Sequence, residues 1–270
     1  MPTGSRWPYL TTLVILLLFL SGHSLLAQDS LRVPYRLSWE TNLTVSGMAA
    51  GSVLFANELR NRVPEVLLSE LRLGRIPPFD QFAVDYNSES ARKASNRTRD
   101  ASTYLPLALL LGKGPRRDII KLALLYGQTV ALRRGLTNIV KYTVRRPRPY
   151  LHDPSLAPTT VVRSYDREAF LSGHTSGSAA TAFFFGRVFA DYYPDSKLKP
   201  YIWTLSASLP ALTGYFRIRA GQHYPSDVIA GYVLGAVIGY TVPILHRIPI
   251  GRNNMVLSPT GTGFYLSYRF

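Results

Sequence analysis

Three short clusters of residues combine cationic or imidazole side chains with signals for the ends of helices. The first contains Lys141, Arg145, Arg146 and Arg148, and two prolines in the same segment disfavour helical backbone there. Guanidinium and ammonium groups at such a helix end can hold the oxygens of a phosphate ester. A solvated basic helix end, favoured by the helix dipole, would explain the same residues without any ligand.

The second cluster is Ser172-Gly173-His174. Ser172 is a good N-cap, and Gly173 leaves the first-turn amides uncovered, so an anion could bind there beside His174. A plain helix start explains Ser172 and Gly173 but does not explain the imidazole. The same three residue types also occur in this order at residues 21–23, near the amino terminus, so this cluster alone is weak support for a site.

The third cluster contains Arg217, His223 and Asp227. Pro225 suits the first position of a helix, so His223 would precede that helix and Asp227 would lie one turn into it, able to approach the imidazole. A carboxylate on one ring nitrogen fixes the tautomer and raises the basicity of the other nitrogen, as a nucleophilic histidine requires. A zinc site would need a third ligand at a suitable spacing, so no metal is expected.

Apolar stretches separated by polar, proline-containing segments predict an all-α, six-helix bundle that carries these clusters. The stretches are Leu43–Ala56, Tyr104–Leu111, Ile119–Leu132, Ala169–Phe189, Tyr201–Phe216 and Val228–Leu245. The clusters fall on one side of the bundle if the last four stretches alternate in direction. In the last stretch, Gly231, Gly235 and Gly239 lie on one face and permit close approach of a neighbouring helix.

The remaining segments give the expected organisation of the chain. Residues 1–27 contain the apolar run Leu10–Leu20 and predict a signal peptide. An uncleaved anchor is the alternative, because Leu25 stands where signal cleavage prefers a small residue. Residues 28–100 form an N-terminal helix and a polar segment of short helices or loops, in which no chemistry is expected. Residues 101–247 form the core, and alternating residues in 248–270 predict a C-terminal β-hairpin.

Composition limits the partners of the 270-residue chain. Lys and Arg total 31 against 16 Asp and Glu, for a formal charge of +15, which favours an anionic partner such as nucleic acid, acidic lipid or a phosphate ester. No recognised nucleic-acid motif accompanies the cations, so nucleic-acid binding is not expected. The absence of cysteine excludes disulfides, thiolate nucleophiles, iron–sulfur clusters and cysteine-bound zinc.

In this order and spacing, the three clusters resemble the motifs of the type 2 phosphatidic acid phosphatase and vanadium haloperoxidase superfamily. Six residues separate Lys141 from Arg148-Pro149, five separate Arg217 from His223, and three separate His223 from Asp227. The resemblance covers about residues 100–246. Leu171 stands where the family usually has proline and Phe216 where it usually has serine, and the second departure puts substrate preference in doubt.

The resemblance implies a six-helix, metal-independent phosphatase without a cofactor, acting through a phosphohistidine on small phosphomonoesters or lipid phosphates. Phosphatidic acid, phosphatidylglycerol phosphate, isoprenyl diphosphate and lipid A are the lipid types considered. It implies His223 as nucleophile, His174 as general acid and Asp227 as the group that orients His223. The implied phosphate-binding residues are Lys141, Arg148, Ser172, Gly173 and Arg217.

We expect the protein in the cell envelope, membrane-associated, with its site on the periplasmic side. The number of helices that span the membrane is left open, because only Val228–Leu245 approaches the length of a bilayer span. Two alternatives remain: a vanadium haloperoxidase on the same scaffold, and an anion-binding envelope protein without catalysis.

Overall fold

A computed structural model describes residues 33–71, 73–248, 255–260 and 263–268, and the predicted signal peptide lies outside them. The α-helices are α2 (Trp39–Asn61), α3 (Glu89–Tyr104), α4 (Lys113–Arg117), α5 (Ile119–Val144), α6 (Gly173–Tyr192), α7 (Lys199–Arg219) and α8 (Pro225–Leu245). The 3₁₀ helices span Leu68–Glu70, Pro78–Ala83, Leu105–Leu111, Pro149–His152 and Ser164–Arg167. The strands are β1 (Val66–Leu67), β2 (Val161–Val162), β3 (Met255–Thr260) and β4 (Gly263–Tyr268).

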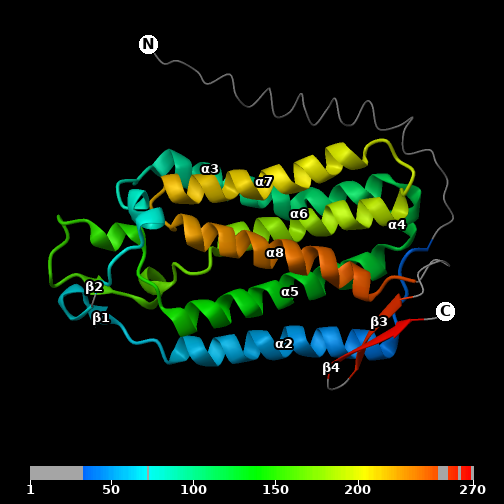
Figure 1. The fold of residues 1–270 in the computed structure, drawn as a ribbon, viewed down its shortest axis with the longest axis horizontal. Coiled ribbons are helices and arrows are strands. Elements are labelled where there is room, and N and C mark those ends of the chain that lie inside the picture. The colour runs from blue at the N-terminus through cyan, green and yellow to red at the C-terminus, as the bar shows by residue number, and fades with distance from the viewer. Residues whose placement is uncertain (1–32, 72, 249–254, 261–262, 269–270) are drawn as a thin grey trace, which may run out of the picture.

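The predicted all-α bundle is confirmed, with long helices packed side by side along the molecule (Figure 1). The prediction was wrong for Tyr104–Leu111, of which Leu105–Leu111 forms a 3₁₀ helix. Pro106 lies at the start of this segment and lacks the amide proton that an α-helix uses. The long helix missing from the prediction is α3, in the segment expected to form only short helices or loops.

The helix ends gather the three clusters at one end of the bundle, on the left in Figure 1. Helix α5 stops at Arg145, whose left-handed φ of 52° ends the helix before the prolines. Helix α6 begins at Ser172, whose Oγ accepts a hydrogen bond from the Thr175 amide at 3.4 Å. Pro225 opens α8. Because α5 to α8 alternate in direction, two C-termini and two N-termini meet there, as the sequence predicts.

Helix α6 is the centre of the bundle, and α8 packs against it without intervening side chains. A Cβ atom on Gly235 would lie 2.1 Å from the Ser176 carbonyl oxygen, and one on Gly239 would lie 2.1 Å from that of Ala180. Gly231 is similarly close to Ser172, at 2.7 Å. The predicted close approach of a neighbouring helix is therefore confirmed, and it fixes the start of α6 relative to α8.

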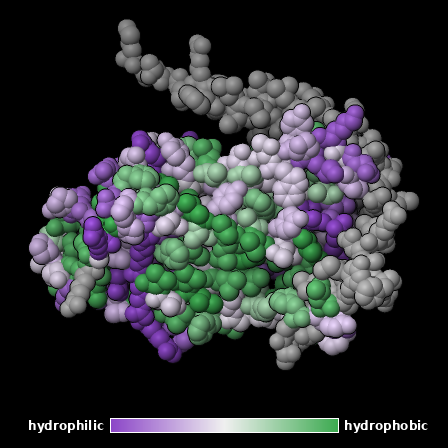
Figure 2. All heavy atoms as spheres, viewed as in Figure 1, coloured by the Kyte–Doolittle hydropathy of each residue, from purple (hydrophilic) through white to green (hydrophobic). Residues whose placement is uncertain are grey.

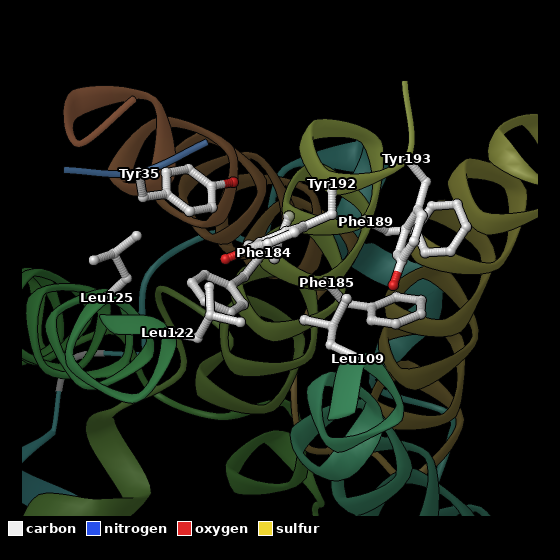
Figure 3. Close-up of a cluster of buried hydrophobic side chains, with 10 residues drawn as sticks. Tyr35, Leu109, Leu122, Leu125, Phe184, Phe185, Phe189, Tyr192 and Tyr193 are labelled. Atoms are coloured by element: carbon white, nitrogen blue, oxygen red, sulfur yellow. The ribbon is translucent and has the colours of Figure 1, made fainter. Parts of the chain in front are cut away.

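The apolar core lies around the C-terminal half of α6, away from the clusters. Figure 3 shows Phe184, Phe185, Phe189 and Tyr192 of α6 among side chains from other segments, including Leu109, Leu122, Leu125 and Tyr35. Tyr35 also donates a hydrogen bond to Asp191 at 2.7 Å. The main hydrophobic core and the three clusters therefore lie at different ends of the bundle.

The predicted C-terminal hairpin is confirmed. Strands β3 and β4 pair antiparallel from Met255↔Tyr268 to Thr260↔Gly263. A second small pair, β1 with β2, was not predicted, and it joins Val66↔Val162 and Leu67↔Val161. This pair ties the segment after α2 to the long connection between α5 and α6, at the end where the clusters meet (Figure 1).

The surface of the bundle carries an apolar band. Figure 2 shows apolar side chains gathered over the middle of α8 and α5, with hydrophilic side chains toward both ends. On α8, Ile229, Val233 and Val237 are exposed at intervals of four residues. Within the described residues, α8 is the one helix long and apolar enough to cross a membrane.

The contact between α6 and α8 gives a stability prediction. Gly239→Ala should lower the free energy of unfolding by about 1–3 kcal/mol, because the new Cβ atom must displace the α6 backbone. Gly127→Ala on α5 should raise it by roughly 0.5–1 kcal/mol, since no atom lies within 4 Å of its Cβ position and alanine favours the helix. Denaturant titration of the purified protein measures both, and an equal effect of the two substitutions would contradict this packing.

Candidate active site

The structure brings three cations from the first and third clusters together, and we name them the cation cradle: Lys141, Arg148 and Arg217. Lys141 lies in the last turn of α5, Arg148 in the segment after it, and Arg217 in the last turn of α7. They are only 7%, 3% and 4% exposed, respectively. All three lower the pKa values of both His174 and His223, so both imidazoles lie within the electrostatic influence of the cradle.

The cradle cations are oriented by neutral oxygen atoms. Lys141 Nζ donates to the Glu168 carbonyl oxygen at 2.8 Å, while the Glu168 carboxylate is 3.9 Å away. Burial, together with Arg148, lowers the pKa of Lys141 to about 7. Burial and Arg148 also lower the pKa of Arg217 to about 9, and its Nε atom is buried without a hydrogen-bond partner among the described residues. The positive charge of the cradle is therefore poorly compensated.

Gln222 and Tyr165 hold the two arginines of the cradle in place. Arg148 donates to the Gln222 carbonyl at 3.2 Å and to its side-chain oxygen at 3.1 Å, and its guanidinium lies 4.2 Å from the centre of the Tyr165 ring. The same Gln222 oxygen accepts from Tyr165 Oη at 3.0 Å and lies 3.4 Å from Arg217 Nη2. Sequence analysis missed both residues, because neither belongs to a pattern that indicates anion binding.

His223 is 1% exposed and its ring orientation is fixed by the backbone. Nδ1 lies 2.7 Å from the carbonyl oxygen of Ala169, which can only accept, so Nδ1 carries a proton. Burial, followed by Arg148 and Arg217, lowers the pKa of His223 well below its ordinary value. Nε2 of the neutral ring then keeps the lone pair that a nucleophile needs.

Asp227 does not make the hydrogen bond to His223 that the sequence suggested. Its Oδ2 atom lies 3.8 Å from His223 Nδ1, beyond hydrogen-bond distance. The same oxygen accepts from the Tyr224 amide at 2.8 Å, and Oδ1 accepts from Arg146 Nη1 at 2.5 Å. Asp227 is the third residue of α8, where a carboxylate caps the free amides of the helix start. This capping draws the carboxylate away from the imidazole.

Asp80 holds Arg146 and the start of α8, although its segment was expected to carry no chemistry. Its carboxylate accepts from Arg146 Nη2 at 2.7 Å and from the Ser226 amide at 3.0 Å. Arg146 therefore bridges Asp80 and Asp227, and both carboxylates bind the start of α8. Asp80 lies in the short 3₁₀ helix Pro78–Ala83. A single carboxylate in this segment belongs to no sequence motif, so the sequence did not indicate its role.

The start of α6 places the second cluster beside the cradle. A Cβ atom on Gly173 would lie 3.5 Å from Lys141 Cε, so the lysine passes close to this backbone. The Ser172 hydroxyl is buried, lies 2.9 Å from Thr175 Oγ1 and caps α6. Burial, together with Arg217 and Arg99, lowers the pKa of His174 to about 2.

Helix α3 supplies two contacts to His174 that sequence analysis missed. His174 Nε2 lies 2.9 Å from Asn96 Oδ1 and 3.0 Å from Arg99 Nη1. Helix α3 buries only small side chains, Ala91, Ser95 and Ser102, so it lacks the run of large apolar residues by which the other helices were predicted. The spacing of these small residues, four and then seven, was the available signal.

The arrangement can bind a phosphate-like dianion between the cradle cations and present two neutral imidazoles to it. Every residue predicted for the site lies at this end of the bundle, and Asp227 lies on the Nδ1 side of His223. The part of the chain that the structure describes contains no group of three or more His, Asp or Glu side chains placed to hold a metal ion.

Comparison with known proteins supports the resemblance that the motifs predict. Residues 122–248 match the model of the PAP2 superfamily, so the resemblance predicted from the motifs is confirmed. The lipid A 4'-phosphatase of Porphyromonas gingivalis is 32% identical over 99 residues, which are 36% of this chain and 39% of that protein. Phosphatidylglycerophosphatase B of Bacillus subtilis is 26% identical over 148 residues, covering 53% of this chain and 67% of that protein.

These matches are partial, because the first of these relatives is covered over less than half of its own length. A crystal structure of a transmembrane PAP2-type phosphatidylglycerolphosphate phosphatase from Bacillus subtilis aligns with 75% of this chain and 92% of that chain. The two are 17% identical, and the TM-score is 0.43.

The geometry of the cradle predicts which arginine binds an anion. Arg217→Lys should weaken the binding of inorganic vanadate by about 1–3 kcal/mol, because lysine cannot reproduce the bidentate hydrogen bonds of a guanidinium. Arg145→Lys should have little effect, since Arg145 is exposed and bonds the Tyr142 carbonyl. Calorimetric titration with vanadate measures both affinities. Equal, small losses would mean that Arg217 does not face the anion.

Proposed function

We propose that this member of the PAP2 superfamily is a phosphoric ester hydrolase that acts on phosphate monoesters, with lipid phosphates as its substrates. The observation that carries this proposal is the burial of Lys141, Arg148 and Arg217 around His223. Among the described residues, the one carboxylate within 4.0 Å of these cations is that of Glu168, 3.9 Å from Lys141. Buried cations cost several kcal/mol unless an anion compensates them. A phosphoryl group supplies two negative charges and several acceptor oxygens, which suit this cradle.

The first chemical step transfers the phosphoryl group to His223. Nε2 attacks phosphorus opposite the ester oxygen, so a P–N bond forms while the P–O bond to the leaving group breaks. His174 gives a proton to the departing alkoxide, which becomes the product alcohol. The cradle stabilises the charge on the non-bridging oxygens during this transfer.

The second step releases phosphate. His174, which has lost its proton, accepts one from a water molecule as that water attacks the phosphorus atom. The P–N bond breaks, inorganic phosphate forms, and His223 regains its lone pair. Both transfers use the same cradle, so side-chain cations supply the electrostatic stabilisation throughout.

Lipid phosphates are the proposed substrates because both relatives are named as phosphatases of lipids, and because the bundle has an apolar band on its surface (Figure 2). An apolar band allows the protein to sit beside or within a bilayer while its polar end faces the headgroups. The predicted signal segment supports our proposal that this end faces the periplasmic side of the envelope.

Inhibitor and chelator experiments test the chemistry. We expect hydrolysis of phosphate esters to survive EDTA and to be blocked by vanadate, which mimics the phosphoryl transition state and would bind the cradle. A phosphate-release assay on the purified full chain measures both effects. Full loss with EDTA and recovery with zinc would contradict this mechanism. Peroxide-dependent bromide oxidation by the vanadate-loaded protein would favour a haloperoxidase instead.

The two histidines should differ in their dependence on the leaving group. His174→Ala should slow phosphoenzyme formation from alkyl and lipid phosphates by roughly 10²–10⁴-fold, because an alkoxide needs a proton to depart. Nitrophenyl phosphate should be affected less, since phenolate leaves without help. His223→Ala should abolish turnover of both substrates and leave no acid-labile phosphoenzyme.

Rapid-quench measurement of phosphoenzyme separates these roles from an effect on the second step. If His174→Ala slows phosphoenzyme formation equally for good and poor leaving groups, His174 is not the general acid. A phosphoenzyme that persists in His223→Ala would show that another side chain is the nucleophile.

A further inference from the structure

The contacts of His174 with α3 have opposite hydrogen-bond polarity. Asn96 Oδ1 can only accept a hydrogen bond, and Arg99 Nη1 can only donate one. A single ring nitrogen therefore satisfies one partner at a time. When Nε2 carries a proton it donates to Asn96, and when Nε2 is bare it accepts from Arg99.

Arg99 is held in position by Asp100, and the helix that carries both partners is bonded to the bundle. The Nε and Nη2 atoms of Arg99 donate to Asp100 at 2.9 and 2.7 Å, which leaves Nη1 directed at His174. Helix α3 is fixed to the bundle by the hydrogen bond between Ser102 and Ser178 at 2.5 Å. Asn96 and Arg99 are three residues apart, so they share one face of the helix.

The second nitrogen of the ring is the one available to the substrate. His174 Nδ1 has no hydrogen-bond partner among the described residues, whereas Nε2 is occupied by α3. The Gly173 backbone next to it lies against Lys141, one of the cations expected to hold the phosphoryl group. A proton transferred to or from substrate would therefore move through Nδ1.

We propose that Asn96 and Arg99 are positioning residues that set the protonation of His174 through its Nε2 atom. Arg99 keeps Nε2 bare before phosphate binds, and Asn96 holds Nε2–H during the reaction. This inference rests on the proposed phosphatase function. It assigns to α3 a role in a site otherwise built from α5, α6, α7 and α8.

The protons balance over the cycle. When the phosphate dianion binds, His174 takes up one proton from solvent and becomes an imidazolium, with Nε2–H donating to Asn96. The imidazolium gives its Nδ1 proton to the leaving alkoxide and keeps Nε2–H. In the second step Nδ1 accepts a proton from the attacking water, so Nε2 keeps its proton and its bond to Asn96 throughout both transfers. When inorganic phosphate leaves, His174 releases one proton to solvent and Nε2 is bare again.

The charges that face His174 explain why the substrate triggers proton uptake. They come from every element around it: Arg99 from α3, Lys141 from α5, Arg148 from the following segment, and Arg217 from α7. All four are cationic and, together with burial, favour the neutral ring. A bound dianion opposes them, and it also offers the Nη1 atom of Arg99 a phosphate oxygen in place of Nε2.

Histidine NMR on the full chain, labelled with ¹⁵N in the imidazole rings, tests the inference directly. The His174 signals are assigned by their loss in His174→Gln. In the wild type, Nε2 should be bare without anion and protonated with bound vanadate. Arg99→Gln should raise the pKa of His174 by about one unit, and the alkaline limb of kcat/KM for an alkyl phosphate should move upward with it. Arg97→Ala, exposed on the same helix, is the control and should change neither.

Asn96 is tested by substitution and by rescue. Asn96→Ala should lower kcat for alkyl phosphates roughly tenfold or more, with a smaller loss in phosphoenzyme formation from nitrophenyl phosphate. Asn96→Asp keeps an acceptor on Nε2–H and should restore much of the rate. A purely structural role for Asn96 would give equal losses for both substrates and no rescue by Asp.

The outcomes separate this inference from the proposed function. An inactive wild-type protein whose His174 still responds to vanadate and to Arg99→Gln would overturn the phosphatase function and support the coupling of α3 to His174. The roles assigned to α3 would be overturned by a different result. In that result, wild type, Arg99→Gln and Arg97→Ala are all active and His174 has the same pKa in all three.

Discussion

The burial of Lys141, Arg148 and Arg217 at one end of a helical bundle is the constraint on which the rest of the structure depends. Such charges are costly to remove from water, and they must be held apart from carboxylates that would neutralise them. The bundle meets this requirement by separating its two ends. The aromatic and aliphatic core surrounds the C-terminal half of α6, and glycines of α8 fix the other end of α6 by backbone contact.

The connection between α5 and α6 orients the site through its carbonyl groups. Three carbonyl oxygens within five residues each accept from a different member of the site: Tyr165 from Arg148, Glu168 from Lys141, and Ala169 from His223. A carbonyl dipole orients a cation or an imidazole without cancelling a full charge. The conformation of residues 165–169 therefore determines the geometry of the cradle, and the β1–β2 pair and the contact with Gln222 hold the connection in place.

The sequence predicted the parts of the site that belong to a pattern. Helix-end signals around Arg148, Ser172 and Pro225 placed the clusters at one end, and glycine spacing on α8 predicted its contact with α6. Helix α3 was not predicted because it packs through small side chains, an alanine and two serines, and has no run of large apolar residues. Its Asn96 and Arg99 were missed for the same reason. The position of Asp227 depends on competition between a helix start and an imidazole for one carboxylate, which residue spacing does not determine.

Both histidines contact neutral oxygen acceptors, a carbonyl for His223 and an amide for His174. A carboxylate at either place would raise the pKa of the ring and would compensate part of the cradle charge. For His223, protonation would remove the lone pair that attacks phosphorus. The Asp227 carboxylate, 3.8 Å from His223, and the Asp80 carboxylate are instead bonded to Arg146 and to the start of α8. Positive charge is thus left for the phosphoryl group, while the imidazoles are oriented by groups that carry no net charge.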